Sequence, residues 1–324
     1  MRIDVHAHYY PAALYELLER LTGQPQRRLG PAAPGFAHHV SIAGQLELMD
    51  AAGIDCMVIS LGNTPPYHTS VEVAAAAARG SNDLYVDLHT RHPRRFAVFS
   101  ALPLPHVAEA LQELERGLDL PGVVGIGLGC SVLGRPLDDP MFDPLFEELN
   151  RRQTVVFVHP VGAGGGPNSQ DFSLTWMLAS RFEDTIAMAR LILSGLTLRY
   201  PDIRFIIPHL GGTLALFLQR MDNVAERDGW HEKFQVAAMP SDLARRFWFD
   251  TVNEQHSALR CACETFGADR LLLGTDWPML PPEKLKHFVD YVPEALPAQQ
   301  AQRILDLNAA QLLGLTVGAQ ANSA

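Results

Sequence analysis

The sequence lacks the segments that direct a protein into a membrane or out of the cell. It begins with MRIDVH, where no basic segment precedes an apolar stretch in the manner of a signal peptide. A membrane-spanning helix needs at least about 18 consecutive apolar residues. The apolar stretches here are short and are interrupted by glycine, proline or charged residues. We therefore expect a cytoplasmic protein without a membrane partner.

Cysteine is scarce. The four cysteines are Cys56, Cys130, Cys261 and Cys263, and none of them forms a Cys-x-x-Cys pair. Cys261 and Cys263 stand two residues apart in a helical pattern, which directs their side chains to different faces. The sequence thus argues against a zinc site built on thiolates, and in a reducing compartment no disulfide is needed. We interpret the cysteines as buried thiols that pack as small hydrophobic groups.

Basic residues are outnumbered, with 26 lysines and arginines against 36 aspartates and glutamates and a net charge of −10. This balance argues against nucleic acid or an anionic membrane surface as a partner. It does not exclude a small anionic substrate, because a bound metal ion or one or two arginines can set the local field. No Gly-x-Gly-x-x-Gly segment opens a helix after the first apolar run, which argues against a dinucleotide-binding fold.

Eight short apolar runs alternate with longer amphipathic segments along the 324 residues. Nearly continuous apolar runs are typical of parallel strands that are covered on both faces. Eight strand–helix units favour a closed (β/α)8 TIM barrel of the α/β class over an open doubly wound sheet. The expected strands are Ile3–His8, Cys56–Leu61, Phe96–Leu102, Val123–Leu128, Val155–His159, Arg204–His209, Phe247–Asp250 and Leu271–Asp276.

The amphipathic segments between the runs predict the helices. The first of them ends at Gly53, a residue type that commonly caps helix C-termini. We expect a single domain across residues 1–324, with the barrel at about 2–313 and a frayed tail at 315–324. Gly23–His39 is expected to form a loop after the first strand and Gly162–Gln170 a mobile loop after the fifth. The expected helices are Ser41–Ala52, Val71–Arg91, His106–Leu118, Met141–Arg152, Leu174–Tyr200, Thr213–Glu226, Glu254–Phe266 and Ala298–Leu313.

The candidate site residues stand at the carboxyl ends of four of these runs. They are His6 and His8 on the first, His159 on the fifth, His209 on the sixth and Asp276 on the eighth. A single histidine at a strand end is more often a hydrogen-bonded structural residue. Barrel active sites, however, are built at these strand ends, and several buried ionisable groups near one point need a compensating cation. Three imidazoles and one carboxylate suit zinc, and manganese or iron less exclusively.

These residues stand in motifs that resemble the amidohydrolase superfamily. The nearest resemblance is to the branch of α-amino-β-carboxymuconate-ε-semialdehyde decarboxylase and related non-oxidative aromatic acid decarboxylases. It runs from residue 2 to about residue 313 and includes the segment LILSG at residues 191–195. The motifs are His6-Ala7-His8, His159-Pro160, His209-Leu210-Gly211-Gly212 and Thr275-Asp276-Trp277-Pro278.

The resemblance implies one divalent metal ion, zinc before manganese or iron, held by four side chains. It implies that His209 is the acid–base residue and that Asp276 moves a proton besides binding the metal. The fourth run has no lysine that could be carbamylated to bridge two metals, so we expect a single ion. The implied ligands are His6, His8, His159 and Asp276.

Arg220 follows His209 by eleven residues, a spacing at which the resemblance implies binding of a substrate carboxylate across a homodimer interface. The alternative for Arg220 is an ordinary surface residue. Trp176 and Trp277 could flank a planar substrate or belong to the core. Around residues 34–40 the family places a second arginine, whereas this chain has His38 and His39, which leaves the exact substrate open.

We expect a non-oxidative decarboxylase of a small planar acid, such as a hydroxybenzoate or a carboxymuconate-like acid. A metal-dependent hydrolase of a lactone, ester or amide would use the same ligands and the same histidine, and so would a hydratase. A non-catalytic scaffold with a retained metal site is a further alternative. No ligand of the family pattern is missing from the sequence, which speaks against a scaffold.

Overall fold

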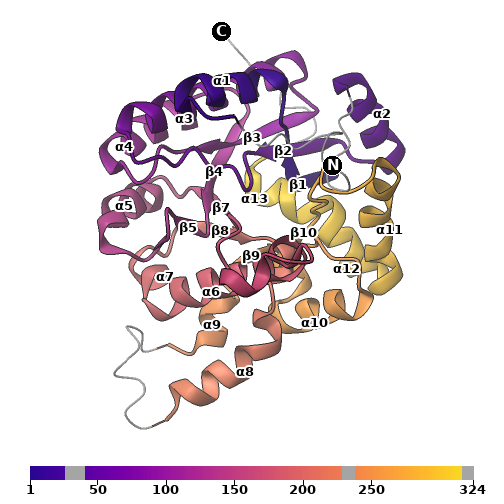
Figure 1. Ribbon diagram of the computed structural model, residues 1–324. Coiled ribbons are helices and arrows are strands. Elements are labelled where there is room, and N and C mark those ends of the chain that lie inside the picture. The colour runs from indigo at the N-terminus through magenta and orange to yellow at the C-terminus, as the bar shows by residue number, and fades with distance from the viewer. Residues whose placement is uncertain (26–40, 228–237, 316–324) are drawn as a thin grey trace.

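The computed structural model describes residues 1–25, 41–227 and 238–315 (Figure 1). One sheet holds eight parallel strands in the order β1-β2-β3-β4-β7-β8-β9-β10. Val5 N–H donates to the carbonyl of Leu273 at 2.9 Å, and Ala7 pairs with Trp277, so the first and last strands meet. The expected (β/α)8 barrel is confirmed. The strands are β1 (Ile3–His8), β2 (Cys56–Ser60), β3 (Phe96–Ala101), β4 (Val123–Gly129), β7 (Val155–His159), β8 (Arg204–Ile207), β9 (Trp248–Asp250) and β10 (Leu271–Leu272).

The sixth and eighth strands are shorter than the sequence predicted. β8 ends at Ile207 because Pro208 has no N–H with which to continue the ladder. β10 covers two residues, after which the chain stays beside β1 through single bonds such as Asp276 N–H to the carbonyl of His6 at 2.8 Å. His209 and Asp276 therefore stand just beyond strands rather than at their last residues.

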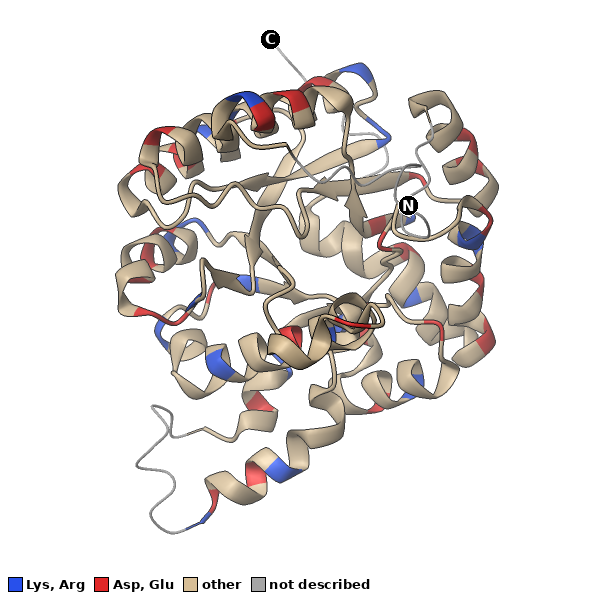
Figure 2. Ribbon diagram, in the orientation of Figure 1, with Lys and Arg blue, Asp and Glu red and all other residues tan. Residues whose placement is uncertain are grey.

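Helices surround the sheet, as Figure 1 shows, and Figure 2 shows acidic and basic residues interspersed along them. α2 begins after Ser41, whose hydroxyl accepts from Gly44 N–H, and ends at Gly53 in the left-handed conformation, as expected. The helices are α1 (Ala12–Thr22), α2 (Ile42–Ala52), α3 (Val71–Arg91), α4 (Val107–Leu118), α5 (Asp143–Arg151), α6 (Ser180–Leu193), α7 (Leu196–Arg199), α8 (Leu214–Ala225), α9 (Pro240–Ala244), α10 (His256–Phe266), α11 (Leu285–Ala295), α12 (Ala298–Gln302) and α13 (Asn308–Leu313).

Several helical expectations need correction, and the sequence patterns also missed the short helix α9. The segment expected as one helix over Leu174–Tyr200 is a π-helical turn, η3 (Thr175–Ala179), then α6 and α7, divided at Gly195, which has a φ of 72°. The sequence patterns missed α1 and α11. Both lie next to prolines, which usually mark helix ends, but Pro11 precedes the first turn of α1 and Pro293 falls in the last turn of α11.

The core has two parts that follow the alternation of side chains along each strand. On β7, Val155 and Phe157 face the barrel interior, whereas Val156 and Val158 pack under the helices. Phe99 of β3 stacks on Phe157 inside the barrel, with ring centroids 5.3 Å apart. The interior is thus a packed core, and the site must lie at its carboxyl end.

Two long loops were expected to extend from the barrel, and the structure describes only the second of them in full. Most of the loop expected at Gly23–His39 lies outside the described residues, as do His38, His39 and residues 316–324 of the expected tail. The loop expected to be mobile at Gly162–Gln170 packs closely on α6: a Cβ at Gly164 would lie 2.6 Å from the carbonyl oxygen of Ala179. Among the described helices, none combines the length and the apolar character needed to cross a membrane.

Candidate metal centre

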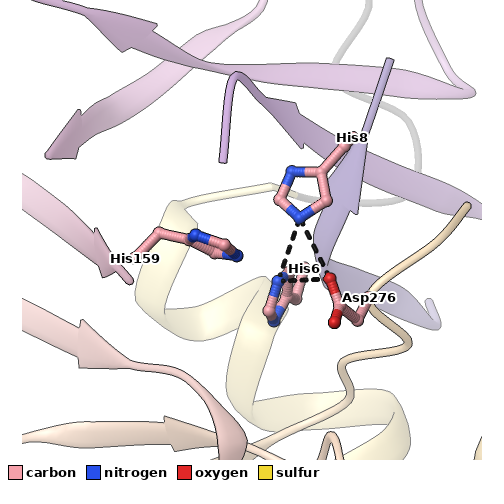
Figure 3. A group of neighbouring side chains, drawn as sticks. All are labelled: His6, His8, His159 and Asp276. Atoms are coloured by element: carbon pink, nitrogen blue, oxygen red, sulfur yellow. Dashed lines mark hydrogen bonds and ion pairs between the residues drawn. The ribbon is translucent and has the colours of Figure 1, made fainter. Parts of the chain in front are cut away.

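Four side chains from three separate parts of the barrel converge at its carboxyl end (Figure 3). Each of them offers one ligand atom, and these atoms all lie within 4.8 Å of one another. The two Nε2 atoms of His6 and His8 are 3.2 Å apart, and Oδ1 of Asp276 lies 3.1 Å from each of them. His6, His8 and His159 are buried, and the Asp276 side chain is 16% exposed.

The outer nitrogen of each imidazole is engaged by an oxygen atom. Nδ1 of His6 donates to Asp250 at 2.6 Å, and Nδ1 of His159 donates to the carbonyl of Pro160 at 2.8 Å. Nδ1 of His8 lies 3.2 Å from the carbonyl oxygen of Ser60, which can only accept. The protons thus sit on Nδ1 and the Nε2 lone pairs face one another.

Lone pairs that face one another in a buried site repel unless a cation lies between them. Nε2 of His159 is buried and has no hydrogen-bond partner among the described residues. Such an orphaned acceptor, pointing toward a carboxylate and two further imidazoles, fits a metal ion. The donor set of three nitrogens and one oxygen is one that zinc, manganese and iron accept.

The pKa shifts of His6 and Asp276 also indicate that this site favours a positive charge. Burial lowers the pKa of His6, but the carboxylates of Asp276 and Asp250 outweigh burial and raise it to about 10. Burial lowers the pKa of His159 well below its ordinary value, and the neighbouring His8 and His6 lower it further. Burial alone would raise the pKa of Asp276, yet His6 and hydrogen bonds from the surrounding imidazoles hold it well below the usual range. The two carboxylates thus favour a positive charge at His6, and a metal ion bound at its Nε2 would supply that charge.

His209 stands beside this cluster on a sharp turn after β8. Its Nδ1 donates to Asp184 at 2.8 Å, which leaves Nε2 facing Oδ2 of Asp276 at 3.6 Å. The φ angles of His209 and Leu210 are 56° and 58°, an uncommon conformation that the following turn maintains. Gly212 is required there, because a Cβ would lie 2.2 Å from the carbonyl oxygen of Arg181 on α6. The two glycines of the His-x-Gly-Gly motif therefore serve the placement of His209.

Comparison with known proteins decides the family. The Amidohydrolase family matches residues 3–315. The chain belongs to this family. The resemblance seen in the sequence motifs is confirmed, and the decarboxylase branch is represented among the relatives of this amidohydrolase.

The chain is 27% identical over 255 residues to 2-amino-3-carboxymuconate-6-semialdehyde decarboxylase of Dictyostelium discoideum, covering 75% of this chain and 70% of that protein. It is 32% identical over 275 residues to gamma-resorcylate decarboxylase of Rhizobium radiobacter, covering 76% and 79%. A crystal structure of dihydroxybenzoic acid decarboxylase from a Polaromonas species, with bound manganese and the inhibitor 2-nitroresorcinol, matches with a TM-score of 0.82 and 24% identity over 98% of each chain. The solved structure shares the fold.

Two carboxylates of this amidohydrolase support the site, and the sequence patterns missed both. Asp250 accepts from Nδ1 of His6 with Oδ2 and from the backbone N–H of His209 with Oδ1, at 2.6 and 2.7 Å. Asp184 on α6 orients His209, and both carboxylates are fully buried. Asp250 ends an apolar run, as Asp276 was expected to do, and that position was the signal that could have found it. Asp184 lies inside a helical pattern and gave no such signal.

A second acidic residue of α6, next to Asp184, holds the glycine-rich loop at residues 162–170. Glu183 accepts hydrogen bonds from the backbone N–H groups of Val161, Gly162 and Ala163 at 2.9 to 3.0 Å. The loop that follows His159 is thereby tied to the same helix that orients His209. This contact is the physical reason that the loop packs on α6; its expected mobility stays a prediction.

The residues expected to bind substrate lie apart from the cluster or beneath it. Arg220 is exposed on α8, which projects from the barrel in Figure 1. Trp176 is half-buried in η3, and its ring lies 2.9 Å from where a Cβ of Gly162 would stand. Trp277 is only 2% exposed and packs in the main hydrophobic cluster.

Proposed function

We propose that this amidohydrolase is a metal-dependent, non-oxidative decarboxylase of small planar carboxylic acids, with hydroxybenzoates and carboxymuconate-like acids as the first candidates. The observation that carries the proposal is that the two carboxylate oxygens of Asp276 face different partners. Its Oδ1 faces the imidazole nitrogens of His6 and His8 at 3.1 Å, while its Oδ2 faces Nε2 of His209 at 3.6 Å. One carboxylate thus connects the cation position with an acid–base histidine.

We assign the ligand set to His6, His8, His159 and Asp276, with one divalent ion, zinc before manganese or iron. The convergence of their ligand atoms and the orphaned Nε2 of His159 support this assignment. When bound, such an ion supplies a Lewis acid that can hold the substrate carboxylate and a neighbouring oxygen. The manganese in the Polaromonas decarboxylase supports a divalent ion in a related barrel.

Decarboxylation needs a proton at the ring carbon that carries the carboxylate. In the proposed reaction the new carbon–hydrogen bond forms first. The bond between the ring and the carboxylate then breaks, its electron pair returns to the ring, and carbon dioxide leaves. Asp276 and His209 would deliver the proton, since Oδ2 of Asp276 and Nε2 of His209 lie side by side at the site. Asp184 would hold His209 with Nε2 toward the substrate at each turnover.

Substrate contacts and oligomeric state belong to the same proposal. Arg220 would bind a second carboxylate by paired hydrogen bonds across a homodimer interface, and Trp176 would contact the ring. The exposed apolar side chains of η3, α6 and α8 support a partner surface, because patches of this kind mark interaction sites. They include Met177 (68% exposed), Ile186 (60%) and Leu216 (70%).

The domain and its location are also proposed. Residues 1–324 would form one amidohydrolase barrel domain, and the family match over 3–315 supports this. All four cysteines are free thiols, which fits the reducing environment of the cytoplasm. The proposed chemistry does not depend on the cytoplasmic location.

Deuterium incorporation tests the proposed reaction. Metal-loaded enzyme is incubated in heavy water with hydroxybenzoates and, separately, with lactones and esters. A decarboxylase releases carbon dioxide and leaves one deuterium at the carbon that carried the carboxylate. His209→Ala should abolish this while retaining the metal. Turnover of lactones or esters with no carbon dioxide from any acid would replace the proposal by the hydrolase alternative.

A further inference from the structure

A narrow pocket lies inside the barrel next to His159, between β2, β3, β4 and β7. His159 is also one of the four converging residues, so the pocket adjoins the cation position. The lining residues are Ser60, Leu61, Gly62, Pro65, Phe99, Ala101, Gly127, Leu128, Phe157 and His159.

The wall that β4 contributes has no side chains. Gly125 pairs with Phe99 on β3, and Gly127 pairs with Phe157 on β7. Residues that pair in a parallel sheet point to the same face, and both phenylalanines point into the barrel interior. The inward positions of β4 are therefore the alternate glycines Gly125, Gly127 and Gly129.

These three glycines differ in what a side chain would meet. A Cβ at Gly125 would lie 2.4 Å from the carbonyl oxygen of Val155, and one at Gly129 would lie 2.6 Å from Cγ1 of Val161. At Gly127 the nearest atom would be 3.7 Å away, an ordinary van der Waals contact. The first two glycines are needed for close packing, whereas Gly127 leaves room for a group that the protein itself does not supply.

The pocket offers no free polar partner to such a group. Its polar side chains are Ser60, whose hydroxyl lies 3.2 Å from Nδ1 of His8, and His159, whose Nε2 faces the cation position. Among the described residues that line the pocket, the other side chains are apolar and none is an aspartate, glutamate, lysine or arginine. A charged or hydroxylated group would lose its hydration there without a full replacement, which disfavours its binding.

We propose that this pocket, of about 10 Å³, receives one small apolar substituent of the substrate, such as a methyl group, and that Gly127 determines how large that substituent can be. The inference rests on the proposed decarboxylase function and specifies its substrate class. It favours acids with an apolar substituent over acids that carry a second charge at the same position.

Two substitutions test the role of Gly127: one reduces the space in the pocket and the other increases it. Gly127→Ala fills the space with one methyl group, and Gly127 has no positive φ that alanine would resist. Ala101→Gly, on the paired position of β3, widens the same pocket. The measured quantity is kcat/KM of the metal-loaded enzymes for 2-hydroxybenzoate and for its ring-methylated isomers. Metal content and melting temperature serve as controls for the site and the fold.

Wild-type enzyme should turn over at least one methylated isomer. Gly127→Ala should lower kcat/KM for that isomer about 10-fold or more relative to the unmethylated acid, and Ala101→Gly should shift the ratio the other way. An unchanged ratio in both variants, or rejection of every methylated isomer by the wild type, would overturn this inference alone. Absence of carbon dioxide release from every acid would overturn the proposed function, and this inference with it.

Discussion

Asp184 and His209, which are 25 positions apart in the sequence, form a buried hydrogen bond of 2.8 Å that fixes the orientation of the histidine proposed as the acid–base residue. Nδ1 of His209 donates, so Nε2 is left without a hydrogen-bond partner among the described residues and points toward Asp276. The carboxylate also accepts from Sγ of Cys130 at 3.6 Å. The Asp184 carboxylate thus orients His209 from the side opposite Nε2. Its negative charge stabilises the imidazolium that forms when Nε2 takes a proton.

This relationship predicts the effect of removing that charge. Asp184→Asn keeps the shape but not the charge, so we expect kcat to fall about 10- to 100-fold with the metal content unchanged. Steady-state kinetics and elemental analysis measure both quantities. Asp138→Asn is the matched control, since Asp138 pairs with Arg190 on the outer surface at 2.7 Å. Unchanged kcat in Asp184→Asn would mean that His209 needs no support from α6.

A second prediction concerns metal affinity. Asp250 accepts from Nδ1 of His6 at 2.6 Å and thereby keeps the Nε2 lone pair directed at the cation position. Asp250→Asn should weaken metal binding about 10- to 100-fold. Competition with a chelator of known affinity measures the change, with Asp138→Asn again as the control. Equal affinity of Asp250→Asn and the wild type would show that His6 does not depend on Asp250 for its orientation.

A third prediction concerns the glycine-rich loop. Glu183 accepts three backbone hydrogen bonds from residues 161–163, so these amide protons should exchange slowly with solvent. Glu183→Ala should speed their exchange and lower the free energy of unfolding by about 2 kcal/mol. Glu183→Gln keeps an acceptor and should lose less of both. Fast exchange at these amides in the wild type would restore the mobile loop expected from the sequence.

A fourth prediction is a pH dependence of stability away from the site. Hydrogen bonds from Arg151 and Arg152 lower the pKa of Glu148 from 4.5 to about 2. A lowered carboxyl pKa stabilises the fold fully above the unfolded value of about 4.5, and this contribution disappears as the pH falls toward the folded value of about 2.

Glu148→Gln should therefore be less stable than the wild type at pH 7, by no more than about 1 kcal/mol because the ion pairs are partly exposed. The difference should shrink as the pH is lowered below 4.5. Urea unfolding of both proteins at a series of pH values measures it. A difference that stays constant from pH 7 to pH 3 would rule out the ion pairs as its source.

The barrel was predictable because its signal is local. Each strand buries both faces, so each appears in the sequence as an apolar run, and β1 and β7 have the expected bounds. The converging residues were predictable because strand ends of a barrel meet at one face, which brings His6, His159 and Asp276 together although they are far apart in sequence.

The supporting residues were not predictable, since their partners lie in other elements. Asp184 is one of several acidic residues on amphipathic helices, and only the packing of α6 against the turn after β8 distinguishes it. The packing of the glycine-rich loop depends on Glu183 in the same way. Glycines that permit close approach and glycines that permit motion look alike in a sequence.

The most direct test of the central claim is the metal content of the purified protein measured together with carbon dioxide release. Wild-type protein prepared without chelator should contain about one divalent ion per chain, as expected for a single four-ligand site, and should release carbon dioxide from a hydroxybenzoate or a carboxymuconate-like acid. Asp276→Ala should lose both, because Asp276 is proposed as ligand and proton carrier. A protein that binds no metal even after reconstitution, or an Asp276→Ala variant with full metal and full activity, would contradict the account.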